Sequence, residues 1–145
     1  TAASYLQKVS AIGENNLTLE QKIDFYNYNA VLENIALKFD VSVRYSEEAE
    51  KLALEIQDSI KIAESILSKV KILIGQKDLK KAKKQLQRSL QYLKFQKNSE
   101  LIEDSYFAYG RAYYLQNMDS ALYYFKKSIV TAKAKNNLYK QIEAY

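Results

Sequence analysis

The sequence predicts an all-α fold, an α-solenoid of about three antiparallel helix-turn-helix repeats with a short leading helix and the start of a fourth repeat. Composition is the first reason: the 145 residues include no proline and only three glycines, so most turn residues of a β-protein are missing. A repeat is the second. Displacing the chain by about 40 residues aligns five columns of small or apolar residues, and their steps of 3, 4, 3 and 4 match one face of a helix. The columns are Phe39, Leu79 and Met118; Ser42, Ala82 and Ala121; Ser46, Leu86 and Phe125; Ala49, Ser89 and Ser128; and Ala53, Leu93 and Ala132.

A further helix is expected before each helix that carries these columns. Its apolar face in the second and third copies consists of Ile62, Ile66, Val70 and Leu73, aligned with Ile102, Tyr106, Gly110 and Tyr113. The first copy admits two faces, because a glutamate ends the aligned one. The aligned face is Ile23, Tyr26, Ala30 and Glu33, and the alternative is Phe25, Tyr28, Leu32, Ile35 and Phe39.

The expected elements follow in order along the chain. They are a leading helix at 2–12, helix pairs at 19–38 and 41–57, 59–75 and 78–96, and 99–116 and 118–135, and a new helix from 138. Thr18 with Gln21 forms a capping box, and Asp58 and Ser99 stand where N-caps are expected.

Polar dipeptides mark the expected turns. Lys77-Asp78 and Gln116-Asn117 are predicted as the tight turns within helix pairs. Gln57-Asp58, Asn98 and Asn136-Asn137 are predicted to separate the copies.

The third copy carries the most specific motif of the chain. Residues 106–113 read Tyr-Phe-Ala-Tyr-Gly-Arg-Ala-Tyr, and Ala121 and Phe125 follow in the next helix. This pattern resembles the tetratricopeptide repeat (TPR) signature, in which glycine and alanine let two helices approach closely while aromatic rings fill the remaining space.

The resemblance covers roughly residues 20–137. With its long helices the chain is similar to the TPR arrays of bacterial peptide-sensing regulators, and to those in the amino-terminal regions of bacterial sensor kinases and transcription regulators. It departs from the signature in lacking the closing proline and in a spacing of 39 to 40 residues rather than about 34. Armadillo or HEAT repeats, which have longer periods, are therefore the structural alternative.

The resemblance implies a scaffold that binds a protein or peptide on a concave face lined by the first helix of each pair. The implied positions are Asp104, Phe107, Arg111, Tyr114 and Leu115 in the third copy, and Glu64, Leu67, Lys71 and Ile74 in the second. Arginine and tyrosine suit a binding surface because they combine contact area with directional polar groups. The alternative is that these are ordinary solvated or packing residues. Exposed repeat ends also suggest self-association.

Charge makes nucleic acid the alternative partner. The net charge is +5, and residues 61–98 hold 11 basic and 2 acidic groups. The basic run lies opposite the apolar column, so a solvated outer face is the preferred interpretation, and phosphate binding through residues 77–97 is the alternative. The run is Lys80, Lys81, Lys83, Lys84, Arg88 and Lys94. Of the thirteen tyrosines, those on or beside the packing columns favour core filling over base stacking: Tyr106, Tyr113, Tyr123 and Tyr124.

Missing residue types restrict the chemistry. Without histidine and cysteine the chain lacks the usual ligands of zinc, copper and haem, the cysteine or histidine nucleophile and the commonest general base. We therefore expect no enzyme activity, no cofactor and no metal site.

We expect residues 1–145 to form a single repeat domain, since no linker or low-complexity stretch interrupts them. The chain opens at Thr1 and stops within an expected helix, so we expect a fragment of a longer protein. No apolar run reaches membrane-spanning length. A cytoplasmic location is expected, or a periplasmic one if a signal precedes this piece.

Overall fold

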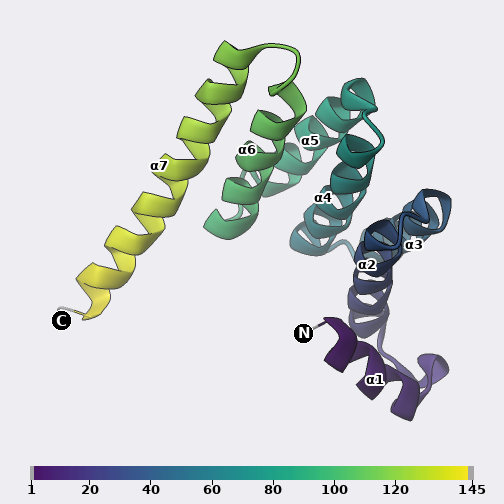
Figure 1. Cartoon of the computed structure of the whole chain (residues 1–145). Coiled ribbons are helices and arrows are strands. Elements are labelled where there is room, and N and C mark those ends of the chain that lie inside the picture. The colour runs from purple at the N-terminus through teal and green to yellow at the C-terminus, as the bar shows by residue number, and fades with distance from the viewer. Residues whose placement is uncertain (1, 144–145) are drawn as a thin grey trace.

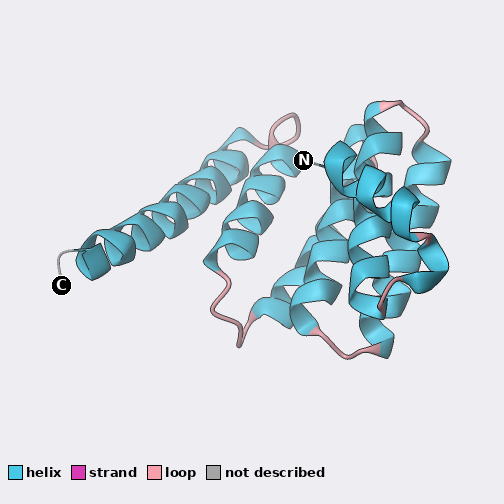
Figure 2. Cartoon of the chain, turned by 90° about the horizontal axis from the view of Figure 1, so that it is seen from below, coloured by secondary structure: helices cyan, strands magenta, loops and turns pink. Residues whose placement is uncertain are grey.

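The computed structural model describes residues 2–143, and this part of the chain is helical throughout, with short connections and no strand (Figure 1, Figure 2). The all-α expectation is therefore confirmed for these residues. The elements are α1 (Ala2–Ile12), the 3-10 helix η1 (Glu14–Asn16), α2 (Leu19–Ile35), α3 (Phe39–Glu55), α4 (Ser59–Gly75), α5 (Leu79–Leu93), α6 (Ser99–Tyr113) and α7 (Met118–Glu143).

Neighbouring helices pack in pairs: α2 with α3, α4 with α5, and α6 with α7. The pairs touch in two ways. α3 packs on α4 and α5 packs on α6, while the first helices α2, α4 and α6 also contact one another in succession. Figure 1 shows the resulting arch, with α1 and α2 in one arm and α7 in the other.

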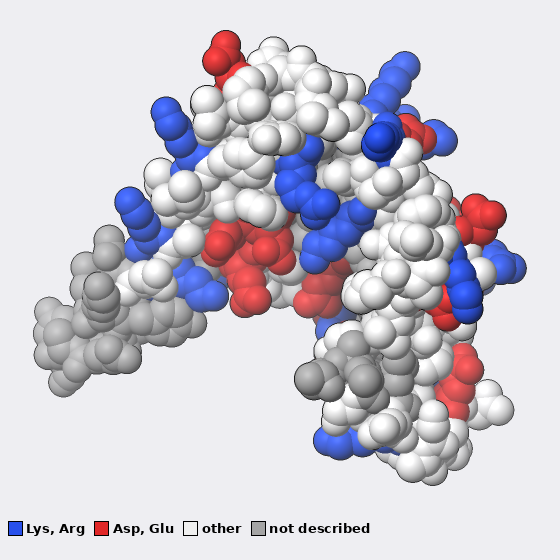
Figure 3. Space-filling model, in the orientation of Figure 1, with Lys and Arg blue, Asp and Glu red and all other residues white. Residues whose placement is uncertain are grey.

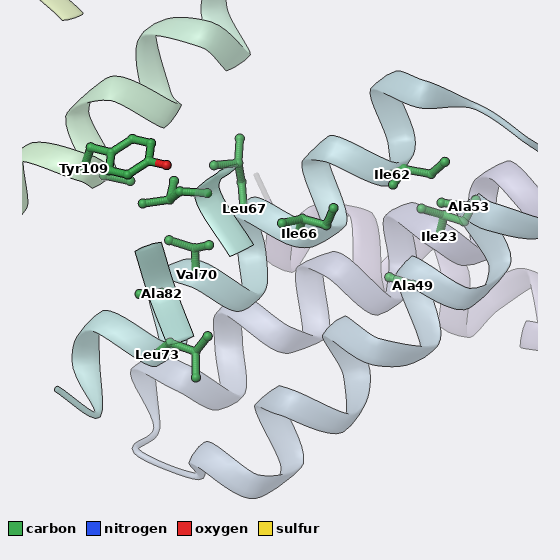
Figure 4. Packing of buried hydrophobic residues seen from close by; sticks show 12 residues of the cluster. Ile23, Ala49, Ala53, Ile62, Ile66, Leu67, Val70, Leu73, Ala82 and Tyr109 are labelled. Carbon is green, nitrogen blue, oxygen red and sulfur yellow. The ribbon is translucent and has the colours of Figure 1, made fainter. Parts of the chain in front are cut away.

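The predicted packing columns form much of the interior. Fully or largely buried members are Ser42, Ala82 and Ala121; Ser46 and Leu86; Ala49, Ser89 and Ser128; and Ala53 and Leu93. Four of them, Ala49, Ala53, Ala82 and Leu86, join the first-helix residues in one continuous cluster (Figure 4). The first-helix residues are Ile62, Ile66, Val70 and Leu73. Burying each large aliphatic side chain contributes about 1.5–3 kcal/mol, so this cluster is the main source of stability. Met118 departs from its column and is 50% exposed.

The first copy uses the aligned face. Ile23 and Ala30 are fully buried, whereas Ile35 of the alternative face is 71% exposed. The alternative is therefore wrong. Glu33, at the end of this face, is half-buried: its carboxylate lies 3.5 Å from the Lys38 ammonium, but Oε2 has no hydrogen-bond partner.

Helix N-termini are capped by side chains at several positions. The Thr18–Gln21 capping box is present, and the Asp58 carboxylate accepts from the Lys61 amide at 2.9 Å. Both predictions are confirmed. Ser99 as an N-cap is wrong: the cap of α6 is Asn98, whose side-chain oxygen accepts from Leu101 N at 3.1 Å. Either residue type is a good cap, so the type alone did not fix the boundary.

Three connections share one backbone turn. Leu37, Gln57 and Lys77 have φ of 60°, 54° and 61°. The next amide in each turn bonds the carbonyl five residues back, as in Lys38 N to Glu33 O, which is the Schellman arrangement. The turns at Leu37 and Gln57 end α2 and α3 at 35 and 55, before the expected 38 and 57, whereas α4 ends at Gly75 as predicted. The helices α5 and α6 also end three residues early, at 93 and 113 and not at 96 and 116, without such a turn.

The last helix differs most from the prediction. α7 continues through Asn136 and Asn137 to Glu143, so the expected division there and the new helix from 138 are both wrong. Asparagine is only modestly unfavourable inside a helix, and neither glycine nor proline is present to break it. The backbone therefore has no local reason to turn.

Candidate partner-binding groove

A groove of about 320 Å³ runs across the first helices α2, α4 and α6. These helices begin at Leu19, Ser59 and Ser99, so equivalent residues are 40 positions apart. The hollow between the two arms in Figure 3 is the same face of the molecule. The groove is lined by Asp24, Asn27, Tyr28 and Val31 of α2, by Lys61, Glu64, Leu67, Ser68 and Lys71 of α4, and by Leu101 and Asp104 of α6.

One row of the groove is acidic. Asp24, Glu64 and Asp104 are the sixth residues of the three first helices, and all three line the groove. Seven residues further along α4 and α6 the charge changes to Lys71 and Arg111, both exposed, whereas the equivalent residue of α2 is Val31. Seven residues are two helical turns, so both rows lie on one face of their helices. Figure 3 shows this separation, with acidic side chains in the lower part of the hollow and basic ones above them.

Lys61 joins the first two members of the acidic row. Its ammonium lies 2.7 Å from Asp24 Oδ1 and 3.3 Å from Glu64 Oε2. Burial lowers the pKa of Lys61, but the hydrogen bond to Asp24 and the charge of Glu64 outweigh it, so the pKa is raised. Burial also raises the pKa of Glu64, although Lys61 opposes this shift. The bridge to Asp24 therefore ties α2 to α4 across the groove.

The floor of the groove holds unsatisfied polar atoms. Asn27 Oδ1 and Ser68 Oγ are buried, and neither has a hydrogen-bond partner. The other end of the Asn27 amide does have one, since its Nδ2 donates to Ser65 Oγ at 3.2 Å. Buried polar groups without partners are uncommon in folded proteins, and two of them line this groove.

Some of the predicted partner-binding residues lie together in the groove. Leu67, Lys71 and Asp104 line it, as does Glu64. Leu67 contributes little surface, because it packs in the underlying core cluster and is only 3% exposed. The exposed lining is therefore mostly polar on α4 and α6.

The remaining predicted residues lie outside the groove lining. Phe107 packs on Phe125 of α7, with ring centroids 5.5 Å apart. Ile74 is half-buried against the core cluster. Arg111 and Tyr114 are exposed at the end of α6. Leu115, in the turn after α6, is also exposed.

Sequence reasoning missed the contribution of α2 and part of that of α4 and α6. The missed lining residues are Asp24, Asn27, Tyr28, Val31, Lys61, Ser68 and Leu101. Asp24 lies 40 residues before Glu64, so the repeat itself indicates that Asp24 occupies the equivalent position in the first copy. The first copy admits two helical faces, so this displacement alone does not assign a groove residue to α2.

The tyrosines of the third pair fill its interior. Tyr124 stacks on Tyr109 and Tyr113, with centroid distances of 4.6 and 5.6 Å. Burial is the main reason that the pKa of Tyr109 rises to about 12. Tyr106 also stacks on Tyr124, at 6.5 Å. Tyr123 contacts the edge of this stack but is 53% exposed, so the prediction of core filling is wrong for this residue.

The basic face of α5 is partly occupied by internal contacts. Arg88 pairs with Glu50 at 2.6 Å, and Lys81 pairs with Asp78 at 2.9 Å. Lys83 lies 4.3 Å from the centre of the Tyr113 ring. Lys80 and Lys84 remain exposed to solvent.

Among the described residues, no group of three or more acidic side chains is placed to hold a metal ion. None of the described helices is both long and apolar enough to cross a membrane. Comparison with protein-family models, with curated proteins and with solved structures found no match to this chain.

Proposed function

We propose that this chain is a protein- or peptide-binding scaffold, built as an α-solenoid of TPR type, and that the groove across α2, α4 and α6 is its binding surface. The observation that carries the proposal is the repetition of groove residues at equivalent positions of three successive helices. A surface that repeats in this way presents one long recognition face, which suits an elongated partner. The setting we propose is the interaction or sensory region of a larger bacterial regulatory or signalling protein.

The side chains at the groove and its upper end support binding. Tyr28, Arg111 and Tyr114 are exposed there, and these residue types dominate the energetics of protein interfaces. Lys71 and Asp104 add charges that fix the orientation of a partner. We propose binding without catalysis, because Lys61 is held in ion pairs with Asp24 and Glu64 and Ser68 Oγ has no hydrogen bond to a base.

Nucleic-acid binding through residues 77–97 has less support. Arg88 and Lys81 are engaged in ion pairs, and Lys83 lies over an aromatic ring. Phosphate binding draws its affinity from free cations that release counterions, so engaged cations contribute less.

The test is a pull-down from the source cell with the double variant Arg111→Ala/Tyr114→Ala. Both side chains are exposed, so the fold is expected to survive, and circular dichroism checks this. The matched control is Lys80→Ala/Lys84→Ala on the outer face of α5. The proposal expects loss of the partner with the groove variant and full recovery with the control. Equal recovery with both variants contradicts it.

A further inference from the structure

The groove separates its charges by about the width of one helix. Acidic and basic rows are seven residues apart on α4 and α6, which corresponds to about 10.5 Å along a helix axis. A partner helix with its side chains is about 10–12 Å across. Neighbouring extended strands, by contrast, lie only about 4.8 Å apart. A single extended segment therefore reaches one row, whereas a helix lying across α2, α4 and α6 reaches both.

The two edges carry opposite and equal charge. The acidic edge has three carboxylates, Asp24, Glu64 and Asp104, and one ammonium, Lys61, so its net charge is −2. The basic edge has Lys71, which lines the groove, and Arg111, which lies on α6 beyond the lining residues, so its net charge is +2. A partner with the same sign on both flanks meets repulsion at one edge. Electrostatic complementarity of this kind selects among partners more than it adds affinity.

The strip between the rows is less charged. Tyr28 of α2 lies there and is exposed, whereas Leu67 of α4 is almost fully buried. Val31, the thirteenth residue of α2, is exposed and extends the apolar surface. Asn27 Oδ1 and Ser68 Oγ, which have no partners, lie beside them. This strip suits a narrow apolar stripe on the partner.

From these three features we infer that the groove receives an amphipathic α-helix with basic residues along one flank, acidic residues along the other and an apolar stripe between them. The inference rests on the proposed function and specifies the class of partner. First helices in contact have axes roughly 8–10 Å apart, so crossing three of them spans roughly 20 Å, or about 14 residues of helix.

The test uses three designed peptides of 16 residues, each held helical by a side-chain lactam on its outward face. The sorted peptide has leucines on one stripe, lysines on one flank and glutamates on the other. The alternating peptide has the same composition, with lysine and glutamate mixed on both flanks. The third peptide has lysine on both flanks. Fluorescence polarisation measures the Kd of each for the wild-type chain, for Lys71→Glu/Arg111→Glu and for the control Lys80→Glu/Lys84→Glu.

The inference expects the wild type to bind the sorted peptide on the order of tenfold more tightly than the alternating one, since several surface ion pairs each contribute modestly. The variant Lys71→Glu/Arg111→Glu is expected to lose this preference. It is also expected to bind the peptide with lysine on both flanks on the order of tenfold more tightly than the wild type does. The Lys80→Glu/Lys84→Glu control behaves as the wild type.

Equal affinity for the sorted and alternating peptides, or binding to none of the three, overturns the inference. So does equal binding of a proline-containing, non-helical version of the sorted peptide, because that result assigns the groove to an extended segment. The pull-down with Arg111→Ala/Tyr114→Ala distinguishes failure of the proposed function from failure of the helical-partner inference. If the cellular partner still depends on the groove while the peptides show no preference, the proposed function stands and the helical partner is wrong.

Discussion

In the second helix pair α4 and α5 meet through aliphatic side chains, whereas in the third pair α6 and α7 meet through a glycine and aromatic rings. Val70 and Leu86 of the second pair are both fully buried. At the equivalent positions of the third pair stand Gly110 and Phe125, and a Cβ atom built on Gly110 would lie 2.4 Å from the Phe125 ring. A large ring thus occupies the space that the glycine leaves open.

This difference teaches that the architecture needs complementary volumes and not particular residue types. The first pair provides a further solution, in which small residues occupy both positions, Ala30 and Ser46. There the neighbouring Ser42 hydroxyl donates to the carbonyl of Ala30 and joins the two helices by a hydrogen bond. Protein interiors are close-packed, so the two facing side chains must fill the space together. Enlarging or shrinking only one of them is expected to destabilise the pair.

The connections differ as well. Leu37, Gln57 and Lys77 form the same turn three times in the first two pairs. The connection from α5 to α6 is longer, from Lys94 to Asn98, and it carries no residue with positive φ. The third pair is therefore attached by a different kind of connection from the one that joins the first two.

The largest effect is expected from Leu86→Ala, which empties a fully buried position in the second pair. Truncation of a buried leucine costs about 3 kcal/mol through lost burial and the remaining cavity. Urea denaturation measures the change in the free energy of unfolding. The exposed Leu122→Ala in α7 is the control and is expected to change it by less than about 0.5 kcal/mol.

Gly110→Ala tests the third pair. The added methyl group collides with Phe125, so we expect a loss of about 2 kcal/mol despite the better helix propensity of alanine. Gly75→Ala is the matched control, because its Cβ would meet its nearest neighbours at 3.9 and 4.0 Å. The control is expected to be neutral or stabilising. Equal effects at the two glycines would show that the Phe125 contact is unimportant.

Asp58→Ala removes the side-chain cap of α4 and is expected to cost about 1 kcal/mol. Lys38 occupies the N-cap of α3 without a side-chain cap bond, so Lys38→Ala is expected to have a smaller effect. Thermal unfolding of both variants measures the difference, and a larger loss with Lys38→Ala contradicts the assignment.

The smallest effect is expected from Lys77→Gly, and it is a gain. Lys77 adopts a left-handed backbone that glycine adopts without steric cost. Because glycine also loses more conformational entropy on folding, the net gain in stability is expected to be about 0.5 kcal/mol. Gln116→Gly, in the turn between α6 and α7, has no positive φ to relieve and is the control. A gain with Gln116→Gly but not with Lys77→Gly would refute the strain at residue 77.

Sequence reasoning predicted the helices and their buried faces because spacing alone determines which side chains share a face. The Phe39, Leu79 and Met118 column shows the limit. Its position was correct, but Met118 is exposed because no described helix covers that side of α7. The boundaries were less predictable, since Leu37, Gln57 and Lys77 are not typical residues for a left-handed turn.

The groove was predicted only in part. The resemblance to the TPR signature implied Glu64, Leu67, Lys71 and Asp104, which line the groove. The partnerless oxygens of Asn27 and Ser68 depend on tertiary packing and leave no signal in residue spacing.

The successive stacking of the three pairs is tested most directly by distances between spin labels, which the absence of native cysteine makes simple to introduce. Val31, Lys71 and Arg111 are exposed and occupy the same position in α2, α4 and α6. With cysteine-linked labels at pairs of these sites, stacking predicts similar 31–71 and 71–111 distances and a 31–111 distance of about twice either one. Three nearly equal distances would place the helices around a common centre and contradict the account.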